Sequence, residues 1–443
     1  MHATLESLFS RLQADEVVWS LVRLPRNTDF PPGDVDLLVR SNDLARFDQA
    51  ARAAGFVPVP GWQGWPTLMY LFFDRAAGRF LTLDVTDRIA FGRHGQLPTG
   101  AAPGVLERRQ VSGNVATPSP DDAFWLLLLH CLLDKGGVPT HYRERLESGA
   151  AVADVDGECA RLVDAHSGAA AALAAPALRV MAAAGQWEAL EAAAEPLQRS
   201  WTRTQPLRES AQVWARRLRR AAARPALLGR RRGVSIALLG TNGAGKSTLS
   251  EGIAATFPLP VARVYMGLWK NADNDPSPAR QLLDAAARPF RAWKLFFLGR
   301  LLQARGSLVV FDRYVHDARR PPAPPLVAVK RVYFWFLSRA IGTPDLTVLL
   351  DLPGAVAFAR KGEDDIDRTE IERREFLALA DQISLTVVDA TRSPEEVRGD
   401  VLALLWDVYR ARWGGGEAIP RRFPADPCVP VPPPVSESID VVA

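Results

Sequence analysis

Residues 240–247 read Gly-Thr-Asn-Gly-Ala-Gly-Lys-Ser, which is a complete Gly-x-x-x-x-Gly-Lys-Ser phosphate loop. In this motif backbone N–H groups close around phosphate oxygens, the lysine reaches the β and γ phosphates, and the serine hydroxyl binds Mg²⁺. The apolar run 234–239 predicts a buried strand before the loop, and the residues after it predict a helix whose positive end faces the anion. The alternative is a plain glycine-rich turn between strand and helix. The expected nucleotide-binding residues are Gly240, Asn242, Gly243, Ala244, Gly245, Lys246, Ser247 and Thr248.

Composition excludes several classes of protein. A chain of 443 residues with 48% hydrophobic content predicts a folded, soluble protein of two or three domains. Its 54 basic and 50 acidic residues leave a net charge of only +4, so no specific nucleic-acid partner is expected. Cys131, Cys159 and Cys428 are scattered and odd in number, which indicates reduced thiols and a cytoplasmic location. The amino terminus lacks a signal-peptide pattern, and the longest apolar run, around 124–133, is too short to be a transmembrane segment.

Four regions follow one another along the chain. Residues 1–118 alternate strands and helices, with strands expected at 17–24, 35–39, 67–74 and 79–86 and a helix at 41–54. Residues 119–230 read as a helical connector that begins at Ser119 and ends with an arginine-rich stretch at 216–224, interpreted as the solvated face of a linking helix. Residues 231–413 alternate apolar strands with helices, which is typical of a parallel sheet covered on both faces. Residues 414–443 form a proline-rich tail that we expect to be disordered.

Acidic and basic residues follow the later strands of the third region. The strand at 308–311 is followed by Asp312 and Arg313, an acid suited to Mg²⁺ and an arginine suited to a second phosphate. A strand at 344–351 leads into the charged segment 359–368, read either as a mobile lid that brings arginines onto the transferring phosphoryl group or as a solvated helix with ion pairs such as Glu370 with Arg374. The loop 390–397 after the last strand is expected to lie beside a purine base.

Taken in order, these pieces resemble the thymidylate kinase branch of the nucleoside monophosphate kinases over residues 233–410. The resemblance implies ATP with Mg as donor and a small-molecule phosphomonoester, such as a nucleoside monophosphate, as acceptor. It assigns Lys246 and Ser247 to the donor phosphates and magnesium, and Asp312 and Arg313 to the acceptor side, with Asp312 as a second metal residue. Because the phosphate loop contains no arginine, Arg360 and Arg368 are the expected catalytic arginines of the lid.

This sequence departs from the family mainly around the acceptor. Thymidylate kinases usually carry an aspartate where Asn242 stands and an Arg-Glu-Pro-Gly segment where residues 264–269 read Val-Tyr-Met-Gly-Leu-Trp. After Asp-Arg-Tyr they usually continue with a serine and an Ala-Tyr pair, whereas residues 315–320 here read Val-His-Asp-Ala-Arg-Arg. The donor half therefore matches the family, while the identity of the acceptor stays open.

A second resemblance lies near the amino terminus. Asp34 and Asp36 stand two apart on one expected strand, so both project to one face, and Asp84 has the same placement on another. If the strands are neighbours, the three carboxylates converge and could hold two Mg²⁺ ions. The pattern resembles the nucleotidyltransferase superfamily that includes polymerase beta, although residues 23–28 replace its usual Gly-Ser pair. An active domain, a degenerate binding domain and two solvated acids on an edge strand all stay open.

The expected fold class is α/β: a parallel-sheet P-loop kinase domain preceded by an α+β nucleotidyltransferase-like domain and a helical connector. The expected function is ATP- and Mg-dependent phosphotransfer. The alternatives are a nucleotide-binding switch without turnover and a bifunctional nucleotidyltransferase and kinase of activated-sugar or surface-glycan metabolism. The amphipathic stretch 289–305, with Trp293 and Phe297, is expected to pack on the sheet rather than lie on a membrane surface, and a homodimer is compatible with the sequence.

Overall fold

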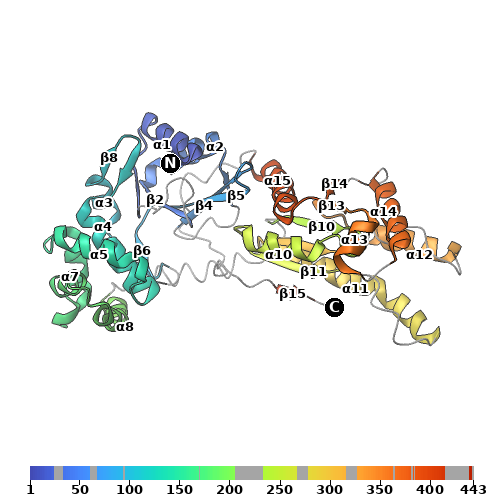
Figure 1. Ribbon diagram of the computed structural model, residues 1–443. Coiled ribbons are helices and arrows are strands. Elements are labelled where there is room, and N and C mark those ends of the chain that lie inside the picture. The colour runs from blue at the N-terminus through green and yellow to red at the C-terminus, as the bar shows by residue number, and fades with distance from the viewer. Residues whose placement is uncertain are drawn as a thin grey trace. The chain divides into compact units, whose positions relative to one another are not determined.

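The computed structural model describes the whole chain except residues 24–32, 60–66, 93–94, 169, 205–232, 267–277, 316–326, 363–364, 381–382, 384, 415–438 and 442–443. The chain forms two compact units (Figure 1). The N-terminal unit contains Met1–Phe72 and Leu81–Ala223, and the C-terminal unit contains Phe73–Phe80 and Arg224–Gly415, as far as these ranges are described. The arginine-rich stretch at 216–224 and most of the predicted tail lie outside the described residues.

The N-terminal unit begins with a mixed five-stranded sheet of order β1-β2-β5-β4-β3. Strand β2 runs antiparallel to β1 and parallel to β5. Strands β4 and β5 have the predicted bounds, and the chain turns between them at Gly78. Two helices share a hydrophobic core with the sheet, and this alternation follows the predicted pattern, although β1 is shorter than expected. The elements are α1 (Ala3–Ala14), β1 (Trp19–Leu21), β2 (Val35–Val39), the 3₁₀ turn η1 (Ser41–Asp43), α2 (Leu44–Ala53), β3 (Val57–Pro58), β4 (Thr67–Asp74) and β5 (Arg79–Thr86).

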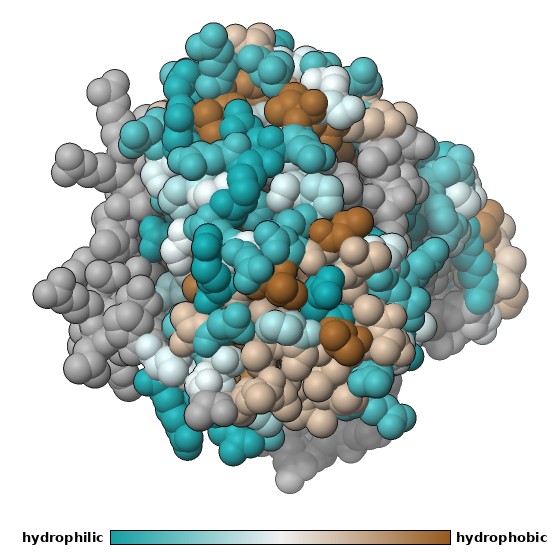
Figure 2. Space-filling view, turned by 90° about the vertical axis from the view of Figure 1, so that its left-hand side faces the viewer, coloured by the Kyte–Doolittle hydropathy of each residue, from teal (hydrophilic) through white to brown (hydrophobic). Residues whose placement is uncertain are grey.

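Helices dominate the rest of this unit, and their buried residues form a core cluster that also takes in Leu38 of β2. Helix α4 begins where predicted, because the Ser119 hydroxyl accepts the N–H of Asp122. The elements are β6 (Ala90–Phe91), β7 (Leu97–Pro98), α3 (Ala102–Glu107), β8 (Gln110–Ser112), β9 (Val115–Thr117), α4 (Pro120–Leu129), the π-helix η2 (His130–Lys135), α5 (Thr140–Val152), α6 (Glu158–Ser167), the 3₁₀ turn η3 (Ala171–Leu173), α7 (Ala175–Ala183) and α8 (Trp187–Thr204). On the side where Figure 1 shows α5, α7 and α8, strongly hydrophobic residues stand singly among hydrophilic and weakly hydrophobic ones (Figure 2).

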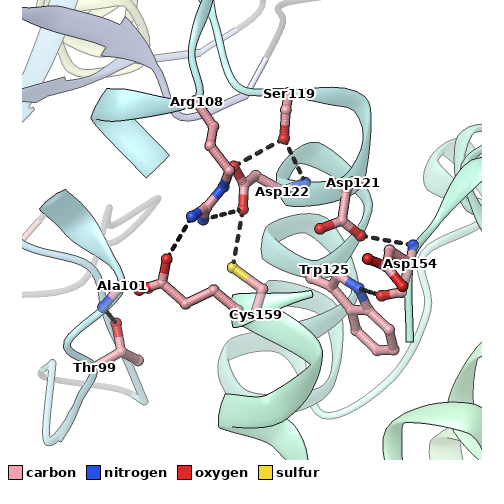
Figure 3. A network of polar contacts seen from close by, with 10 residues as sticks. Thr99, Ala101, Arg108, Ser119, Asp121, Asp122, Trp125, Asp154 and Cys159 are labelled. Carbon is pink, nitrogen blue, oxygen red and sulfur yellow. Dashed lines mark hydrogen bonds and ion pairs between the residues drawn. The ribbon is translucent and has the colours of Figure 1, made fainter. Parts of the chain in front are cut away.

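A buried carboxylate joins three of these helices (Figure 3). Asp122 is fully buried and accepts two bonds from the Arg108 guanidinium, at 3.0 Å to Oδ2 and 2.8 Å to Oδ1. Arg108 also donates to Glu158 at 2.5 Å, and the thiol of Cys159 contacts Asp122 Oδ1 at 3.3 Å. Cys131 and Cys159 are free thiols, as predicted. The network ties the end of α3 and the beginnings of α4 and α6 together, so it is structural in character.

The C-terminal unit is a parallel sheet of order β14-β13-β10-β12-β11-β15, which is the expected α/β architecture. Helices α10 and α15 pack together on one face, and α11 and α14 share the hydrophobic core on the other. The elements are β10 (Ser235–Leu239), α10 (Lys246–Thr256), β11 (Val261–Tyr265), α11 (Pro278–Ala304), β12 (Leu308–Asp312), α12 (Val327–Ala340), β13 (Leu346–Asp351), α13 (Gly354–Lys361), α14 (Ile366–Ala380), β14 (Thr386–Asp389), α15 (Pro394–Trp413) and β15 (Ile439–Val441).

The structure bears on two of the expectations, one for the tail and one for membrane-spanning segments. Ile439–Val441 pairs in parallel with β11, so these residues of the tail predicted to be disordered adopt strand geometry, because Ile439 and Val441 are β-branched and favour strands. Within the described part of the chain, none of the helices combines the length and the apolar character that crossing a bilayer requires.

Candidate active site

The phosphate loop connects the central strand β10 to helix α10. Its glycines have positive φ, at 143° for Gly240, 80° for Gly243 and 89° for Gly245. A Cβ at Gly240 would lie 2.9 Å from the Leu350 carbonyl oxygen, and one at Gly243 would lie 3.0 Å from that of Ala357. Both the backbone angle and the lack of space therefore require glycine at Gly240 and Gly243.

Lys246 begins helix α10 and folds back over the loop. Its Nζ donates to the carbonyl oxygens of Gly240, at 3.0 Å, and Thr241, at 2.9 Å, and the side chain is buried. A buried ammonium needs such acceptors, because an unpaired charge is costly away from water. The same group lies in the loop that a phosphate chain would enter, so phosphate oxygens are alternative acceptors for it.

The next strand of the sheet brings an acid to the same edge. Asp312 ends β12 opposite Leu238 of β10. Its Oδ1 is buried and has no hydrogen-bond partner among the residues that the structure describes. A buried, unpartnered carboxylate oxygen beside a phosphate loop fits a Mg²⁺ ion or a water bound to one, because Mg²⁺ takes oxygen ligands.

Arg313 follows directly and has an unusual backbone. Its φ of 62° lies in the left-handed region, which is uncommon outside glycine, and its N–H donates to the Leu238 carbonyl at 3.2 Å. This conformation turns the side chain toward the phosphate loop, where Nη2 donates to Asn242 Oδ1 at 2.6 Å. Strained backbones of this kind often occur at functional sites.

These residues surround a pocket of about 650 Å³. It contains every phosphate-loop residue predicted to bind nucleotide except Gly240, together with Asp312, Arg313 and Arg360. Four residues of the loop and helix start after β14 also line it, where the sequence predicted a wall beside a purine base. The lining residues are Asn242, Gly243, Ala244, Gly245, Lys246, Ser247, Thr248, Leu249, Tyr265, Asp312, Arg313, Leu350, Arg360, Ala390, Arg392, Pro394 and Val397.

The charged segment after β13 contains two helices, α13 and α14, on either side of residues 363–364, which lie outside the described residues. Arg360 lies in α13 and lines the pocket, but Arg368 lies exposed in α14 and does not. Arg368 therefore does not join the pocket as predicted, because it lies on the exposed side of α14, which begins at Ile366. The ion pair offered as the alternative is present, with Arg374 Nε 3.6 Å from Glu370 Oε1.

A third arginine of this segment has a structural partner. Arg373 donates to both carboxylate oxygens of Asp351, at 2.5 Å and 3.0 Å, and to Glu370 at 3.0 Å. The Asp351 hydrogen bond raises the pKa of Arg373. Glu370 in turn accepts the N–H of Gly354, so the pair fastens α14 to the start of α13 and to the end of β13. This contact fixes the helix on which Arg360 stands.

Neither Arg392 nor Tyr265 was given a role of its own from the sequence, although Arg392 lies in the loop expected beside the base, and both residues line the pocket. Arg392 lies in the loop between β14 and α15 and forms an ion pair with Asp400. Tyr265 ends β11 opposite Asp312. The sequence signal for these two residues was their position after a strand. Residues at the carboxyl ends of parallel strands meet at one edge of the sheet, where ligands bind.

The N-terminal carboxylates are arranged only partly as predicted. Strands β2 and β5 are parallel neighbours with Asp36 opposite Asp84, as expected. However, Arg23 donates to Asp36 at 3.0 Å and 2.5 Å, so that carboxylate already has a cationic partner. Across the described ranges no group of three Asp, Glu, His or Cys side chains is placed to hold a metal ion. The predicted metal site of Asp34, Asp36 and Asp84 is therefore not supported.

Part of the sequence is similar to two thymidylate kinases. No family model matches the chain. A probable thymidylate kinase of Pyrobaculum aerophilum is 26% identical over 192 residues, which is 40% of this chain and 97% of that protein. A thymidylate kinase of Symbiobacterium thermophilum is 37% identical over 87 residues, which is 17% of this chain and 41% of that protein.

Two solved kinase structures also match part of the chain. A thymidylate kinase from Candida albicans matches at 17% identity with a TM-score of 0.31, covering 40% of this chain and 92% of that one. A deoxyadenosine kinase from M. mycoides with bound dATP matches at 17% identity with a TM-score of 0.26, covering 39% of this chain and 98% of that one. The sequence matches show that about 40% of the chain is homologous to thymidylate kinases.

Proposed function

We propose that the C-terminal unit is an ATP- and Mg-dependent phosphotransferase whose acceptor is a small-molecule phosphomonoester, with a nucleoside monophosphate as the first candidate. The observation that carries this proposal is that one pocket is lined by the phosphate loop together with Asp312, Arg313 and Arg360. Homology to thymidylate kinases supports a kinase, and the departures around Asn242 leave the acceptor's base open.

In this proposal the phosphate loop holds the ATP triphosphate. The backbone N–H groups from Asn242 to Thr248 and the Lys246 ammonium bind phosphate oxygens, and the positive end of α10 faces them. Lys246 exchanges its carbonyl acceptors in the loop for the β and γ phosphates. Ala390, Arg392 and Pro394 lie along the pocket where the purine base would rest.

Ser247 and the unpartnered Oδ1 of Asp312 are the residues that would hold magnesium. The ion, when bound, supplies positive charge against the negative charge of the triphosphate. Arg313 binds the acceptor phosphate. Asn242 helps to orient the Arg313 guanidinium, whose Nη2 donates to the Asn242 Oδ1 at 2.6 Å. Arg360 compensates charge on the phosphoryl group as it moves.

The reaction is a single displacement. An oxygen of the acceptor phosphate attacks the γ phosphorus, the bond from that phosphorus to the β–γ bridging oxygen breaks, and ADP leaves with the electron pair. The acceptor phosphate oxygen is already ionised near neutral pH, so the step needs no general base. Positioning and charge compensation are then the main contributions of the protein.

Acceptor-dependent ADP formation tests the proposal. The full chain is incubated with ATP and Mg²⁺ and a panel of nucleoside monophosphates and sugar phosphates, and ADP is measured with and without each acceptor. We expect one class of phosphomonoester to stimulate turnover and Lys246→Ala to abolish it, with Arg368→Ala as a matched control because Arg368 lies outside the pocket. ATP binding by calorimetry without stimulation by any acceptor would favour a nucleotide-binding switch instead.

The remaining sequence-based assignments accompany this proposal. We keep the division at 1–118, 119–230, 231–413 and 414–443, the cytoplasmic location and the absence of a specific nucleic-acid partner as part of it. The nucleotidyltransferase-like character of the N-terminal unit has no support from its carboxylates, so we assign that unit no activity.

A further inference from the structure

Helix α13 lies directly against the phosphate loop. A Cβ added at Gly243 of the loop would stand 3.0 Å from the carbonyl oxygen of Ala357, which lies within α13. Less than one helical turn further along, the same helix carries Arg360, which lines the pocket beside the loop. The position of Arg360 relative to bound phosphates therefore depends on how α13 is held.

Neither Arg360 nor α13 is suited to hold that position alone. Arg360 is exposed, and a long exposed side chain samples many rotamers. Helix α13 has only 8 residues, and the chain leaves it at Gly362 in the left-handed conformation, with a φ of 65°. A helix this short is not stable by itself in water, so it depends on tertiary contacts. Contacts from outside α13 must decide where Arg360 stands.

Helix α14 provides those contacts. The N–H of Gly354, the first residue of α13, donates to Glu370 Oε2 at 3.1 Å. The two segments approach so closely that a Cβ at Gly354 would lie 2.8 Å from the Ile366 carbonyl oxygen. The Glu370 carboxylate also places negative charge at the positive end of α13, which is favourable. Because the start of α13 is attached to α14 in this way, a displacement of α14 moves Arg360 as well.

Arg373 attaches α14 to the sheet. Its guanidinium donates to both carboxylate oxygens of Asp351, from Nε at 2.5 Å and from Nη2 at 3.0 Å, and Nη1 donates to Glu370 at 3.0 Å. Only 25% of the Arg373 side chain and 22% of the Asp351 side chain are exposed. A bidentate pair between an arginine and a carboxylate fixes orientation as well as distance. Arg373 therefore connects the end of β13, through Glu370, to the first residue of α13.

Asp351 also holds the opposite wall of the pocket. Its carbonyl oxygen accepts the N–H of Ala390 at 2.9 Å, and Ala390 lines the pocket where the purine base is expected. The preceding residue, Leu350, lines the pocket as well. The side chain of Asp351 thus holds the helices that carry Arg360, while its backbone holds the loop beside the base.

We propose that Arg373 is a positioning residue, which acts through Asp351 and Glu370 to hold α13 so that Arg360 faces the transferred phosphoryl group. This inference rests on the proposed phosphotransfer, in which Arg360 compensates charge. The exact place of Arg360 matters most in the transition state, whereas the phosphate loop and Lys246 hold the triphosphate in the ground state. Loss of Arg373 should therefore slow the transfer more than it weakens ATP binding.

Steady-state kinetics of acceptor-dependent ADP formation by the full chain test the proposal. R373Q should lower kcat by about tenfold to a hundredfold, as expected for a misplaced catalytic group, while KM for ATP changes by less than about threefold. R373K keeps the charge but loses the bidentate pair, so its kcat should lie between the two. The matched control is R374Q in the next residue of α14, whose guanidinium is 76% exposed and lies 3.6 Å from Glu370, and which should keep the kcat of the unsubstituted chain.

A double-variant cycle separates positioning from a general loss of stability. R360Q alone should lower kcat, and R373Q added to it should lower kcat by less than about twofold more, because no Arg360 is left to position. If R373Q does not fold, R373K takes its place in the cycle. Losses that multiply, an unchanged kcat in R360Q, a raised KM for ATP in place of a lowered kcat, or an equal loss in R374Q overturns the proposal.

Hydrogen exchange distinguishes the failure of this inference from the failure of the proposed function. An ATP analogue should slow exchange in peptides 240–252 and 354–361 of the unsubstituted chain, but only in 240–252 of R373Q. This measurement needs no turnover. If no acceptor stimulates ADP formation, the phosphotransfer proposal fails, and the exchange of 354–361 still decides whether Arg373 holds α13. Equal protection of 354–361 in both proteins overturns the inference.

Discussion

Replacing Asp345 with asparagine should loosen the C-terminal unit at the edge of the sheet opposite the pocket. Asp345 precedes β13 and is nearly buried, with 8% of its side chain exposed. It accepts hydrogen bonds from the Ser235 N–H at 2.8 Å, the Ser235 hydroxyl at 3.0 Å and the Gln303 amide at 2.6 Å, and it pairs with Arg412 at 2.5 Å. One carboxylate thus joins the beginnings of β10 and β13 to the ends of α11 and α15.

The size of the effect follows from these partners. Asparagine has nearly the same shape as aspartate, but it carries no charge. It also offers a single acceptor oxygen, whereas Ser235, Gln303 and Arg412 donate to two carboxylate oxygens of Asp345. Breaking a buried ion pair costs about 3–5 kcal/mol. Because 26% of the Arg412 side chain is exposed and water can reach it, we expect the lower figure of about 2–3 kcal/mol.

The same group predicts a pH dependence. Burial raises the pKa of Asp345, but hydrogen bonds and charge from Arg412 and Ser235 outweigh burial, and the net pKa is lowered. A carboxyl with a lowered pKa in the folded state stabilises the fold above its unfolded pKa of about 3.9, and this stabilisation is lost as the pH falls through the folded value. The difference between the unsubstituted chain and D345N should therefore shrink below about pH 4.

Hydrogen exchange of peptides from β10 and β13 during urea titration is the suitable assay, because a chain of two units need not unfold in one step. The matched control is Glu251→Gln, whose carboxylate lies 3.4 Å from Arg263 and is 68% exposed, and which should stay within about 0.5 kcal/mol of the unsubstituted chain. A loss below about 0.5 kcal/mol in D345N, or one that does not change with pH, would refute the reasoning.

Three further predictions concern single positions. Gly243→Ala should weaken binding of an ATP analogue by about tenfold or more in calorimetry, because the new Cβ lies 3.0 Å from the Ala357 carbonyl at a φ of 80°, whereas Gly399→Ala, which meets no atom within 4 Å, should bind normally. Asp122→Ala should lower the melting temperature of the N-terminal unit by an amount equivalent to about 2–4 kcal/mol, since Arg108 loses its buried partner; an unchanged melting temperature contradicts this role. Burial lowers the pKa of His130, so the folded state binds a proton less readily than the unfolded state. The protein should therefore lose stability as the pH falls below about 6.5. Thermal melts at several pH values should show a smaller loss for His130→Gln.

The sequence predicted the elements whose information is local. The glycines at 240, 243 and 245, the strand before them and the cap at Ser119 are found where expected, because each is determined by neighbouring residues. That Asp34 and Asp36 share one face of their strand was also predicted, since alternation along a strand fixes it, whereas the pairing of Asp36 with Asp84 was only a condition that the structure meets.

Features that depend on distant residues escaped prediction. Both Arg360 and Arg368 were expected at the pocket, and only Arg360 lines it. The difference depends on where α14 begins, and Arg373 fixes that helix through Asp351, which is far away in sequence. The loop 390–397 was expected beside the base, but which of its side chains enter the pocket depends on β14 lying next to β13. The burial of one side of α11 and the exposure of Trp293 likewise follow from the sheet and not from the helix alone.

The order of the strands has a consequence for how the protein is made. Among the strands of the C-terminal sheet, β10 is synthesised first, but its two neighbours in the sheet, β12 and β13, are synthesised much later. Until residue 351 has left the exit tunnel, the phosphate loop lacks at least one of the two strands that flank β10, so its pocket is incomplete and a nucleotide cannot assist the early stages of folding. Chains truncated before β13 should accordingly remain insensitive to ATP in protease digestion, while chains that extend beyond α15 should gain protection from it.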